Sequence, residues 1–329
     1  MIWIKLLASL SSALLILSLW AVFLPALAAP SDTAVSESLE KVKNTRVSLK
    51  PPAGFKPSPL FNGFIMEDKH ASIMVTELPA PASMMINDFT AEKLATKNME
   101  LLDKAPVKVA GSATEGQMLH VKHSVAGQAF EKWITIFGDD KNTVLVVAAT
   151  PEDSEKEFSA ALKESVSKVE WDSKIELDQT AGLNFQIEAS GPLKLARRIQ
   201  NMLLYTEGGN FPAKNPSDPI FIVGQSFANP HIPDREKFCV NRIKQMPGLV
   251  EFSDLHVVSL GSDGKDEADG FEVVAQAVDS KSGDKMFIYQ VIHFAPDSYY
   301  IQQGMVSDNR REELEPVFRK MSGSFKPKS

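Results

Sequence analysis

A short segment in the second half of the sequence imitates the serine motif of α/β-hydrolases. The apolar run 220–223 leads into Gly224-Gln225-Ser226-Phe227-Ala228, which resembles the pattern G-x-S-x-G but has alanine in place of the last glycine. That motif requires a helix directly after the serine, because the sharp turn into the helix holds the hydroxyl beside donated backbone N–H groups. Pro230 and Pro233 follow instead, and both oppose a helix at this point. The sequence therefore predicts no catalytic serine here, and no other catalytic residue stands out.

Histidine and carboxylate residues are too scattered to predict a metal centre. His120 and His123 are three residues apart, and this spacing on a strand directs them to opposite faces. A zinc site needs three or four converging ligands, so we interpret both as core or solvated histidines. The acidic loop 263–269 lacks the ligand spacing of calcium loops, which favours a solvated turn over weak calcium binding. We predict neither a metal nor a cofactor.

The chain has a single cysteine, Cys239, and therefore no intrachain disulfide. A lone thiol in an oxidising compartment is either a reactive group or a buried apolar residue. Cys239 stands four and seven residues before Ile243 and Met246, which is the spacing of one helix face. We therefore expect a buried, structural cysteine.

Candidate partner-binding residues occur only in one part of the second half. They are basic or aromatic and lie in or next to residues 201–229: Arg197, Arg198, Tyr205 and Lys214. Such a group suits an anionic ligand or a partner protein, although an exposed helix and loop would carry the same residues. The stretch 201–229 is rich in glycine and proline, and we interpret it as an ordered, inserted loop.

The elements that must position these residues occur twice, about 150 residues apart. Residues 109–112 precede three strand-like runs and a helix, and residues 259–262 precede the same series. The expected strands are 117–125, 129–137 and 144–149 in the first copy, and 271–278, 286–294 and 299–306 in the second. Their short polar links require antiparallel neighbours. We predict an α+β fold of two tandem domains, each a central antiparallel β-sheet covered by helices.

The remaining elements are less regular. In the first copy we expect strands at 47–49, 63–65 and 71–75, followed by a helix at 87–102. In the second copy we expect a basic helical piece at 194–200, strands at 202–206 and 220–224, and a helix at 234–246. The strand around Trp133 is apolar on both alternating sets of side chains, so both faces of its sheet need cover. Helices on both sides would supply it, and an exposed partner site is the second choice.

The N-terminus carries an export signature. Lys5 precedes an apolar run that ends at Pro25, and Ala26 and Ala28 fit a signal-peptidase site, so residues 1–28 are predicted to be a signal peptide. An uncleaved anchor is the alternative, and the absence of a nearby cysteine excludes a lipoprotein. Residues 29–45 are expected to be a flexible lead-in, followed by domains at 46–172 and 173–329. No later segment reaches membrane-spanning length.

The charge balance restricts the possible partners. The net charge of the whole chain is −7, and it becomes −8 when Lys5 leaves with the signal peptide. Nucleic-acid binding needs clustered lysine and arginine, so this acidic balance argues against it. The sequence favours a soluble protein of the periplasm or another exported compartment.

Several turns and core positions together resemble the PsbP-like fold, which is shared with Ran-binding Mog-type proteins and exported bacterial domains of unknown function. The resemblance rests on 51–55 after an opening strand, 72–75, the long helix, Lys132-Trp133-Ile134, and 150–152 at the last helix. It covers residues 47–172 and, more loosely, 176–326. It implies a central antiparallel sheet between helices and a binding or assembly-support role, and it transfers no catalytic residue.

Two function classes follow. The first is a non-catalytic exported protein that binds an envelope protein or a small ligand, or supports assembly, through the groove between its domains. The second is a hydrolase-like envelope enzyme with its site in the inserted loop. The lack of a converging nucleophile, base and oxyanion donor favours the first class and predicts that the protein is not an enzyme.

Overall fold

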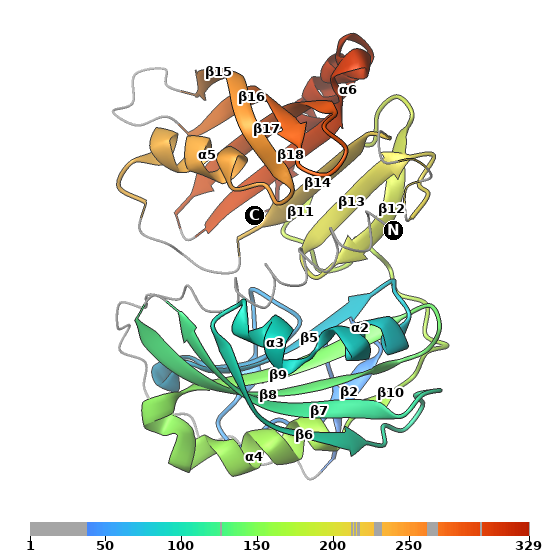
Figure 1. Cartoon of the computed structure of the whole chain (residues 1–329), viewed down its shortest axis with the longest axis vertical. Helices are drawn as coiled ribbons and strands as arrows, with labels where there is room; N and C mark the ends of the chain where they lie inside the picture. The colour runs from blue at the N-terminus through green and yellow to red at the C-terminus, as the bar shows by residue number, and fades with distance from the viewer. Residues whose placement is uncertain are drawn as a thin grey trace. The chain divides into compact units, whose positions relative to one another are not determined.

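The chain folds into two compact units in the computed structural model shown in Figure 1, with the division between Asp178 and Gln179. The structure describes residues 38–125, 127–211, 213, 215, 218–226, 232–261, 269–296 and 298–328. The predicted signal peptide, Lys214 and all but Asp269 of the acidic loop lie outside these residues. Among the described helices, none is long and apolar enough to cross a membrane.

The first unit is built on a seven-stranded antiparallel sheet with the order β3-β4-β5-β9-β8-β7-β6. Its strands are β3 (Lys56–Pro57), β4 (Gly63–Met66), β5 (Ala71–Leu78), β6 (Met99–Val107), β7 (Gly116–Val125), β8 (Gln128–Gly138) and β9 (Thr143–Pro151). A smaller sheet joins β1 (Glu40–Lys41), β2 (Val47–Leu49) and β10 (Glu170–Trp171).

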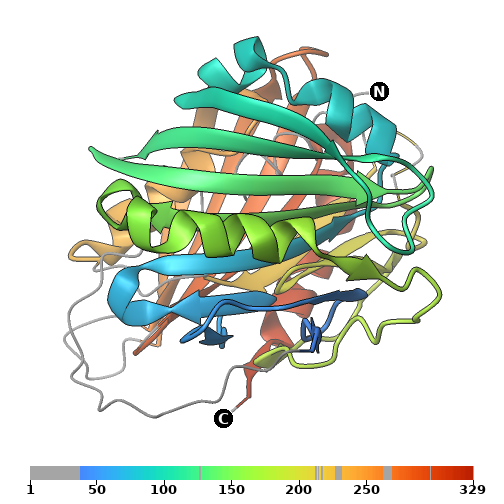
Figure 2. The same ribbon diagram turned by 90° about the horizontal axis from the view of Figure 1, so that it is seen from below.

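Helices cover both faces of the first large sheet. Helix α4 (Glu155–Ser167) lies on one face, while α2 (Ala82–Asp88) and α3 (Ala91–Ala95) lie on the other, as Figure 1 shows. Seen from below in Figure 2, α4 lies in front of the sheet and runs roughly along its strands. Phe158, Leu162 and Val166 repeat at four-residue spacing along α4, and all three are buried against the sheet. Short 3-10 turns η1 (Glu67–Lys69) and η2 (Glu152–Ser154) complete the unit. The expectation that helices cover both faces around Trp133 is confirmed.

The second unit repeats this plan. Its seven-stranded antiparallel sheet has the order β12-β13-β14-β18-β17-β16-β15. The strands are β12 (Leu193–Ile199), β13 (Met202–Glu207), β14 (Ile220–Gln225), β15 (Leu249–Leu260), β16 (Gly270–Asp279), β17 (Lys285–Ala295) and β18 (Ser298–Ser307). Helix α5 (Arg235–Lys244) packs on one face and α6 (Arg311–Gly323), which follows η3 (Asp308–Arg310), packs on the other. A short pair joins β11 (Phe185–Gln186) and β19 (Lys326–Pro327).

Helix α6 comes unusually close to its sheet. Gly304 on β18 lies beneath the Phe318 ring, where an added Cβ would come within 2.6 Å of a ring carbon. Leu314, Phe318 and Met321 are all fully buried in the core on this side. Because Gly304 has no side chain, the aromatic ring of the helix rests directly on the strand.

The strand order of the two units is the same when it is read from one edge to the other. This confirms the predicted α+β architecture, in which one sheet-and-helix plan occurs twice. The three central strands of each copy also lie within a few residues of their predicted positions, and a helix follows them in each copy.

Two sequence predictions about the outer strands are wrong. The helix expected at 87–102 ends at Ala95, and its last residues instead enter edge strand β6, which pairs with β7. Asn98, with a φ of 57°, reverses the chain between the two. The basic piece 194–200 is edge strand β12, not a helix. In both segments, pairing with a neighbouring strand outweighs residues that favour helices.

The stretch 201–229 is not simply an inserted loop. It contains β13 and β14, which occupy the places that β4 and β5 occupy in the first sheet. The lead-in expected through residue 45 is also partly ordered, because β1 pairs with β2 and Val42 is buried in the core.

Candidate functional site

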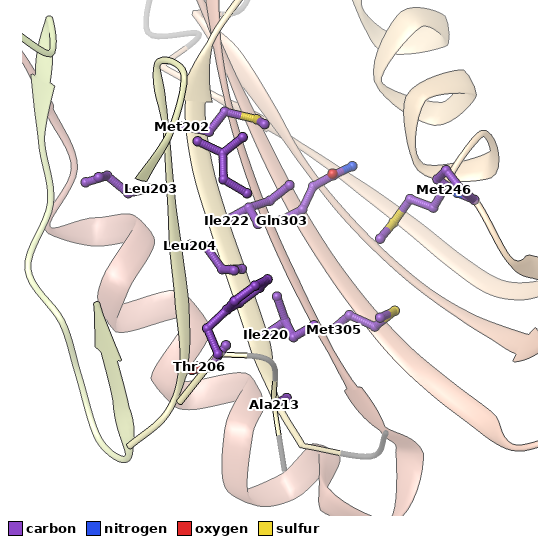
Figure 3. Close-up of a pocket in the computed structure, with 13 residues that line it drawn as sticks. Met202, Leu203, Leu204, Thr206, Ala213, Ile220, Ile222, Met246, Gln303 and Met305 are labelled. Carbon is purple, nitrogen blue, oxygen red and sulfur yellow. The ribbon is translucent and has the colours of Figure 1, made fainter. Parts of the chain in front are cut away.

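An apolar cavity of about 110 Å³ lies on the second sheet, on the face that carries α5. Strands β13, β14 and β18 form its floor, and residues just after α5 form part of its wall (Figure 3). Its lining includes three methionines and five other apolar or aromatic residues that face it: Met202, Met246, Met305, Leu204, Ile220, Ile222, Phe211 and Pro247. Methionine side chains adapt their shape to a contact, so this lining suits an apolar guest.

The alternation of β13 explains which of its side chains reach the cavity. Met202, Leu204 and Thr206 face it, whereas Leu203 points away from it in Figure 3. Leu203 and Tyr205 pack instead with α6 in the core on the opposite face of the sheet. The strand therefore separates a packed core from the cavity.

Among the described residues that line the cavity, two have polar side chains, Gln303 and Thr206. The Nε2 of Gln303 donates to Gln290 Oε1 at 2.9 Å, and the Nε2 of Gln290 donates to the backbone oxygen of Cys239 at 2.8 Å. Thr206 donates its hydroxyl to the backbone oxygen of Asn210 at 2.7 Å. Gln290 is fully buried, and Gln303 is 8 % exposed. The cavity thus has a largely apolar wall and a hydrogen-bonded amide chain at its base.

The candidate partner-binding residues are not assembled into one patch. Tyr205 is only 4 % exposed, and burial raises the pKa of its hydroxyl to about 12. Arg197 and Arg198 are neighbours on edge strand β12 and are half-buried. Arg198 donates to the backbone oxygens of Gln200 and Ala181, so it holds the turn after β12. The structure describes no position for Lys214. Tyr205 as a partner contact is therefore a wrong prediction, because alternation along β13 turns it into the core.

Ser226, the serine of the hydrolase-like motif, belongs to the backbone pairing of the sheet. Its Oγ accepts from the backbone N–H of Tyr299 at 3.0 Å, and its own N–H donates to the Tyr299 oxygen at 2.8 Å. Only 9 % of Ser226 is exposed. Its side chain therefore stabilises the end of β14 beside β18.

The two histidines point to opposite faces of the first sheet, as their spacing predicts. His120 stacks on Trp133 with ring centroids 3.9 Å apart, on the α4 side. His123 lies on the other side, with its Nδ1 2.8 Å from the Nζ of Lys132. In the described part of the chain, no three histidine, cysteine or acidic residues are grouped to hold a metal ion.

The cluster around His120 contains groups that occur in catalytic sites. Glu131 Oε1 contacts His120 Nε2 and accepts from Ser159 Oγ at 2.8 Å, while Trp133 Nε1 donates to the same Ser159 Oγ at 3.0 Å. The serine hydroxyl thus donates to the carboxylate and accepts from the indole, and Glu131 is only 2 % exposed. This arrangement fixes α4 on the sheet and leaves no exposed nucleophile.

Lys132 and His123 form a second buried pair. Lys132 is fully buried, and desolvation lowers the pKa of its ammonium group to about 7. Desolvation and, next, the neighbouring Lys132 charge lower the pKa of His123 to about 4. Both groups are therefore biased towards their neutral forms, but Lys132 has no exposed surface at which it could meet a substrate.

Cys239 is a buried, structural residue, as its helical spacing predicts. It is fully buried on α5 beside Ile243. Burial raises the pKa of its thiol to about 12, so the thiolate is disfavoured at neutral pH.

Sequence reasoning missed the residues that form the cavity. Gln290 and Gln303 interrupt strands that are otherwise apolar, and this interruption was the available signal. The apolar residues of β13 and β14 gave no signal, because their pattern is that of any buried strand.

Neither the known protein families nor the curated proteins contain a match to this sequence. Solved structures do show a likeness. LpqN of Mycobacterium tuberculosis, involved in cell envelope biogenesis, is 14% identical and aligns over 44% of this chain and 83% of its own, with a TM-score of 0.31. The PsbP protein of Synechocystis sp. PCC 6803 (CyanoP) is 11% identical over 44% of this chain and 98% of its own, with a TM-score of 0.32.

One longer neighbour spans both units. The immunity protein TplEi of the type VI secretion system of Pseudomonas aeruginosa is 12% identical over 86% of this chain and 95% of its own, with a TM-score of 0.31. The likenesses concern the fold and assign no function to this chain.

Proposed function

We propose that this protein is a non-catalytic, exported binding protein whose second unit holds a small apolar ligand. The observation that carries the proposal is the cavity on β13, β14 and β18, which is lined almost wholly by apolar side chains. Ligand sites in proteins are concave and mostly apolar, with a few placed polar groups, and this cavity has that composition.

The size of the cavity limits the ligand. A cavity of about 150 Å³ lined by apolar residues binds benzene in another protein. With about 110 Å³, this cavity suits a single ring or a short branched chain, part of which extends through its opening. Larger parts of a ligand would lie outside it.

The chemistry of the lining supports binding over catalysis. Among the described residues that line the cavity, none is a histidine, cysteine, carboxylate or lysine. Proton transfer and nucleophilic attack need such groups within hydrogen-bond reach of the substrate. Ser226 at the end of β14 accepts from the backbone N–H of Tyr299 and is 9 % exposed, which does not favour it as a nucleophile.

Benzene binding tests this proposal. The mature chain, labelled at its methionine methyl groups, is titrated with benzene and followed by NMR. We expect saturable shifts of Met202, Met246 and Met305, which line the cavity, and none of Met84 or Met85 in the first unit.

The Ile222→Phe variant fills the cavity and should abolish these shifts. Ile65→Phe makes the same change at a half-buried strand position of the first unit and should leave them intact. Equal shifts in the two variants, or no shift of the three cavity methionines in the unchanged protein, would contradict the proposal.

A further inference from the structure

The amide chain beneath the cavity has a fixed direction. Gln290 Nε2 lies 2.8 Å from the backbone oxygen of Cys239. A carbonyl oxygen only accepts hydrogen bonds, so the nitrogen of Gln290 must point to it and the oxygen of Gln290 must point to Gln303. That oxygen in turn requires the nitrogen of Gln303, at 2.9 Å. One backbone carbonyl therefore sets the orientation of both amides.

This orientation leaves Gln303 Oε1 as a hydrogen-bond acceptor. With its nitrogen held by Gln290, the carbonyl oxygen of Gln303 accepts no hydrogen bond from the described residues. Gln303 lines the cavity, and Figure 3 shows it extending from β18 towards the side on which Met246 lies. The cavity thus presents one oriented acceptor within an apolar wall.

The Thr206 hydroxyl does not offer a donor to a ligand in the cavity. Its hydroxyl hydrogen is committed to the backbone oxygen of Asn210. A ligand acceptor has only the second N–H of Gln303 to meet, because the first is donated to Gln290 and the Thr206 hydroxyl hydrogen is donated to Asn210. A ligand that brought a donor would satisfy Gln303 Oε1, which otherwise loses its contact with water when an apolar guest fills the cavity.

We propose that the ligand is a small aromatic molecule with one hydrogen-bond donor, of the phenol class, whose hydroxyl donates to Gln303 Oε1. This inference rests on the proposed function, because it needs the cavity to bind a ligand at all. It adds the chemical class of that ligand and names Gln303 as the residue that selects it, with Gln290 as a positioning residue.

Three small aromatic probes distinguish the effect of a hydrogen-bond donor on affinity from the effect of ligand size. Phenol and toluene have nearly the same shape and differ in the donor, and anisole keeps the oxygen but has no donor. Affinities for the full mature chain are measured by NMR at the cavity methionines. Each affinity is corrected for the transfer of that probe from water to cyclohexane, which removes the difference in hydrophobicity. We expect corrected phenol binding to exceed that of toluene and anisole by about tenfold.

Variants test whether Gln303 causes this preference. Gln303→Met keeps the length of the side chain and removes the acceptor, so the phenol preference should disappear while toluene still binds. Gln290→Met removes the partner that orients Gln303, so the preference of phenol over anisole should fall. The matched control is Gln302→Met, the same change at the next position, which faces the opposite side of the sheet. It should leave the preference unchanged.

The outcomes are distinguishable. Binding of benzene and toluene together with equal corrected affinities for all three probes would overturn this inference and leave the proposed function standing. Failure of every probe to shift the cavity methionines would overturn both. The comparison of phenol with anisole in the unchanged protein decides the inference even if a glutamine variant fails to fold.

Discussion

The two units share a strand order. Residue types at corresponding positions are similar on one face of the sheet and different on the other. Phe130 pairs with Pro151 in the first unit, and Met286 and Ser307, each 156 residues later, pair in the second. By this correspondence Trp133 matches Tyr289. Lys163 of α4 lies 4.7 Å from the Trp133 ring centroid, and Arg319 of α6 lies 5.5 Å from that of Tyr289. The face covered by the last helix thus keeps an aromatic ring under a cation in both units.

The opposite face differs in its polar residues. The cross-strand pair Ile134 and Val147 of the first unit corresponds to Gln290 and Gln303 of the second. Conversely, Lys132 and its neighbour His123 correspond to the apolar Ile288 and Ala277. Each unit therefore has a buried polar pair on this face, but the two pairs occupy different positions.

This contrast separates structural from functional positions. The face with α4 or α6 is a packed core in both units, whereas the other face has its cavity beside the amide pair of the second unit. Buried polar groups cost stability unless they are bonded. The amide pair of the second unit is hydrogen-bonded, and it is the polar feature that the proposed ligand would meet.

The largest expected effect is on the face covered by α4 in the first unit and by α6 in the second. Trp133 is 6 % exposed and packs in the core of the first unit, so Trp133→Ala should lower the free energy of unfolding by about 3 to 5 kcal/mol. Hydrogen exchange of the first-unit amides in the mature chain measures the loss. A loss below about 1 kcal/mol, typical of surface sites, would make Trp133 a partner contact instead.

The buried lysine should make the stability of the first unit depend on pH. The pKa of Lys132 is about 7 in the folded protein and about 10.5 in the unfolded chain. Between these values the unfolded chain binds the extra proton, so the free energy of unfolding rises as pH rises from 7 to 10.5. Lys132→Met should stabilise the unit at pH 7, on the order of 4 kcal/mol, and the gain should shrink towards pH 10.

Denaturant titrations at several pH values check this dependence. Lys168→Met removes a lysine that is 69% exposed and serves as the control, with no comparable pH-dependent gain. If both variants behaved alike, desolvation of Lys132 would not govern the stability of the unit.

Gln302 places a buried amide on the α6 side of the second sheet. Gln302 is fully buried, neither its Oε1 nor its Nε2 has a hydrogen-bond partner, and Val146 stands at the corresponding position of the first unit. Gln302→Met should therefore raise the free energy of unfolding of the second unit by about 1 to 3 kcal/mol. The reverse change, Val146→Gln, should destabilise the first unit. Thermal unfolding measures both, and a destabilised Gln302→Met would show that the amide is satisfied in solution.

The smallest expected effect is on the cation–π contact that occurs at corresponding positions in both units. Lys163→Met removes the cation over Trp133 and should cost about 0.5 to 1 kcal/mol, the size of an exposed cation–π contact. Lys168→Met, at the C-cap of the same helix, should cost less. A double-mutant cycle with Trp133→Phe isolates the interaction, and a coupling near zero would mean that the contact is incidental.

Much of the repeated core was predictable because local signals agreed with the final structure. The runs that became β7, β8 and β9 are long, apolar and joined by short polar turns, and antiparallel pairing follows directly from those turns. The burial of Cys239 followed from its spacing with Ile243. These features depend on neighbours in the sequence.

The outer strands and the site were not predictable in this way. The segments that became β6 and β12 contain residues that favour helices, and only the neighbouring strands β7 and β13 make them extended. Tyr205 has the composition of a contact residue, but the alternation of β13 turns it into the core. The sequence offered no sign that Met202, Gln303 and Met246 would meet.

The sequence by itself determined the α+β repeat, the antiparallel hairpins and the acidic charge, because each depends on residue types and on short-range spacing. The tertiary structure decided which strands lie at the edges, which face each side chain takes, and where the cavity forms. It joined β13, β14 and β18 with residues after α5, although these segments are separated by up to about 100 residues along the chain. Contacts across such separations depend on the packing of the whole unit, which no local pattern encodes.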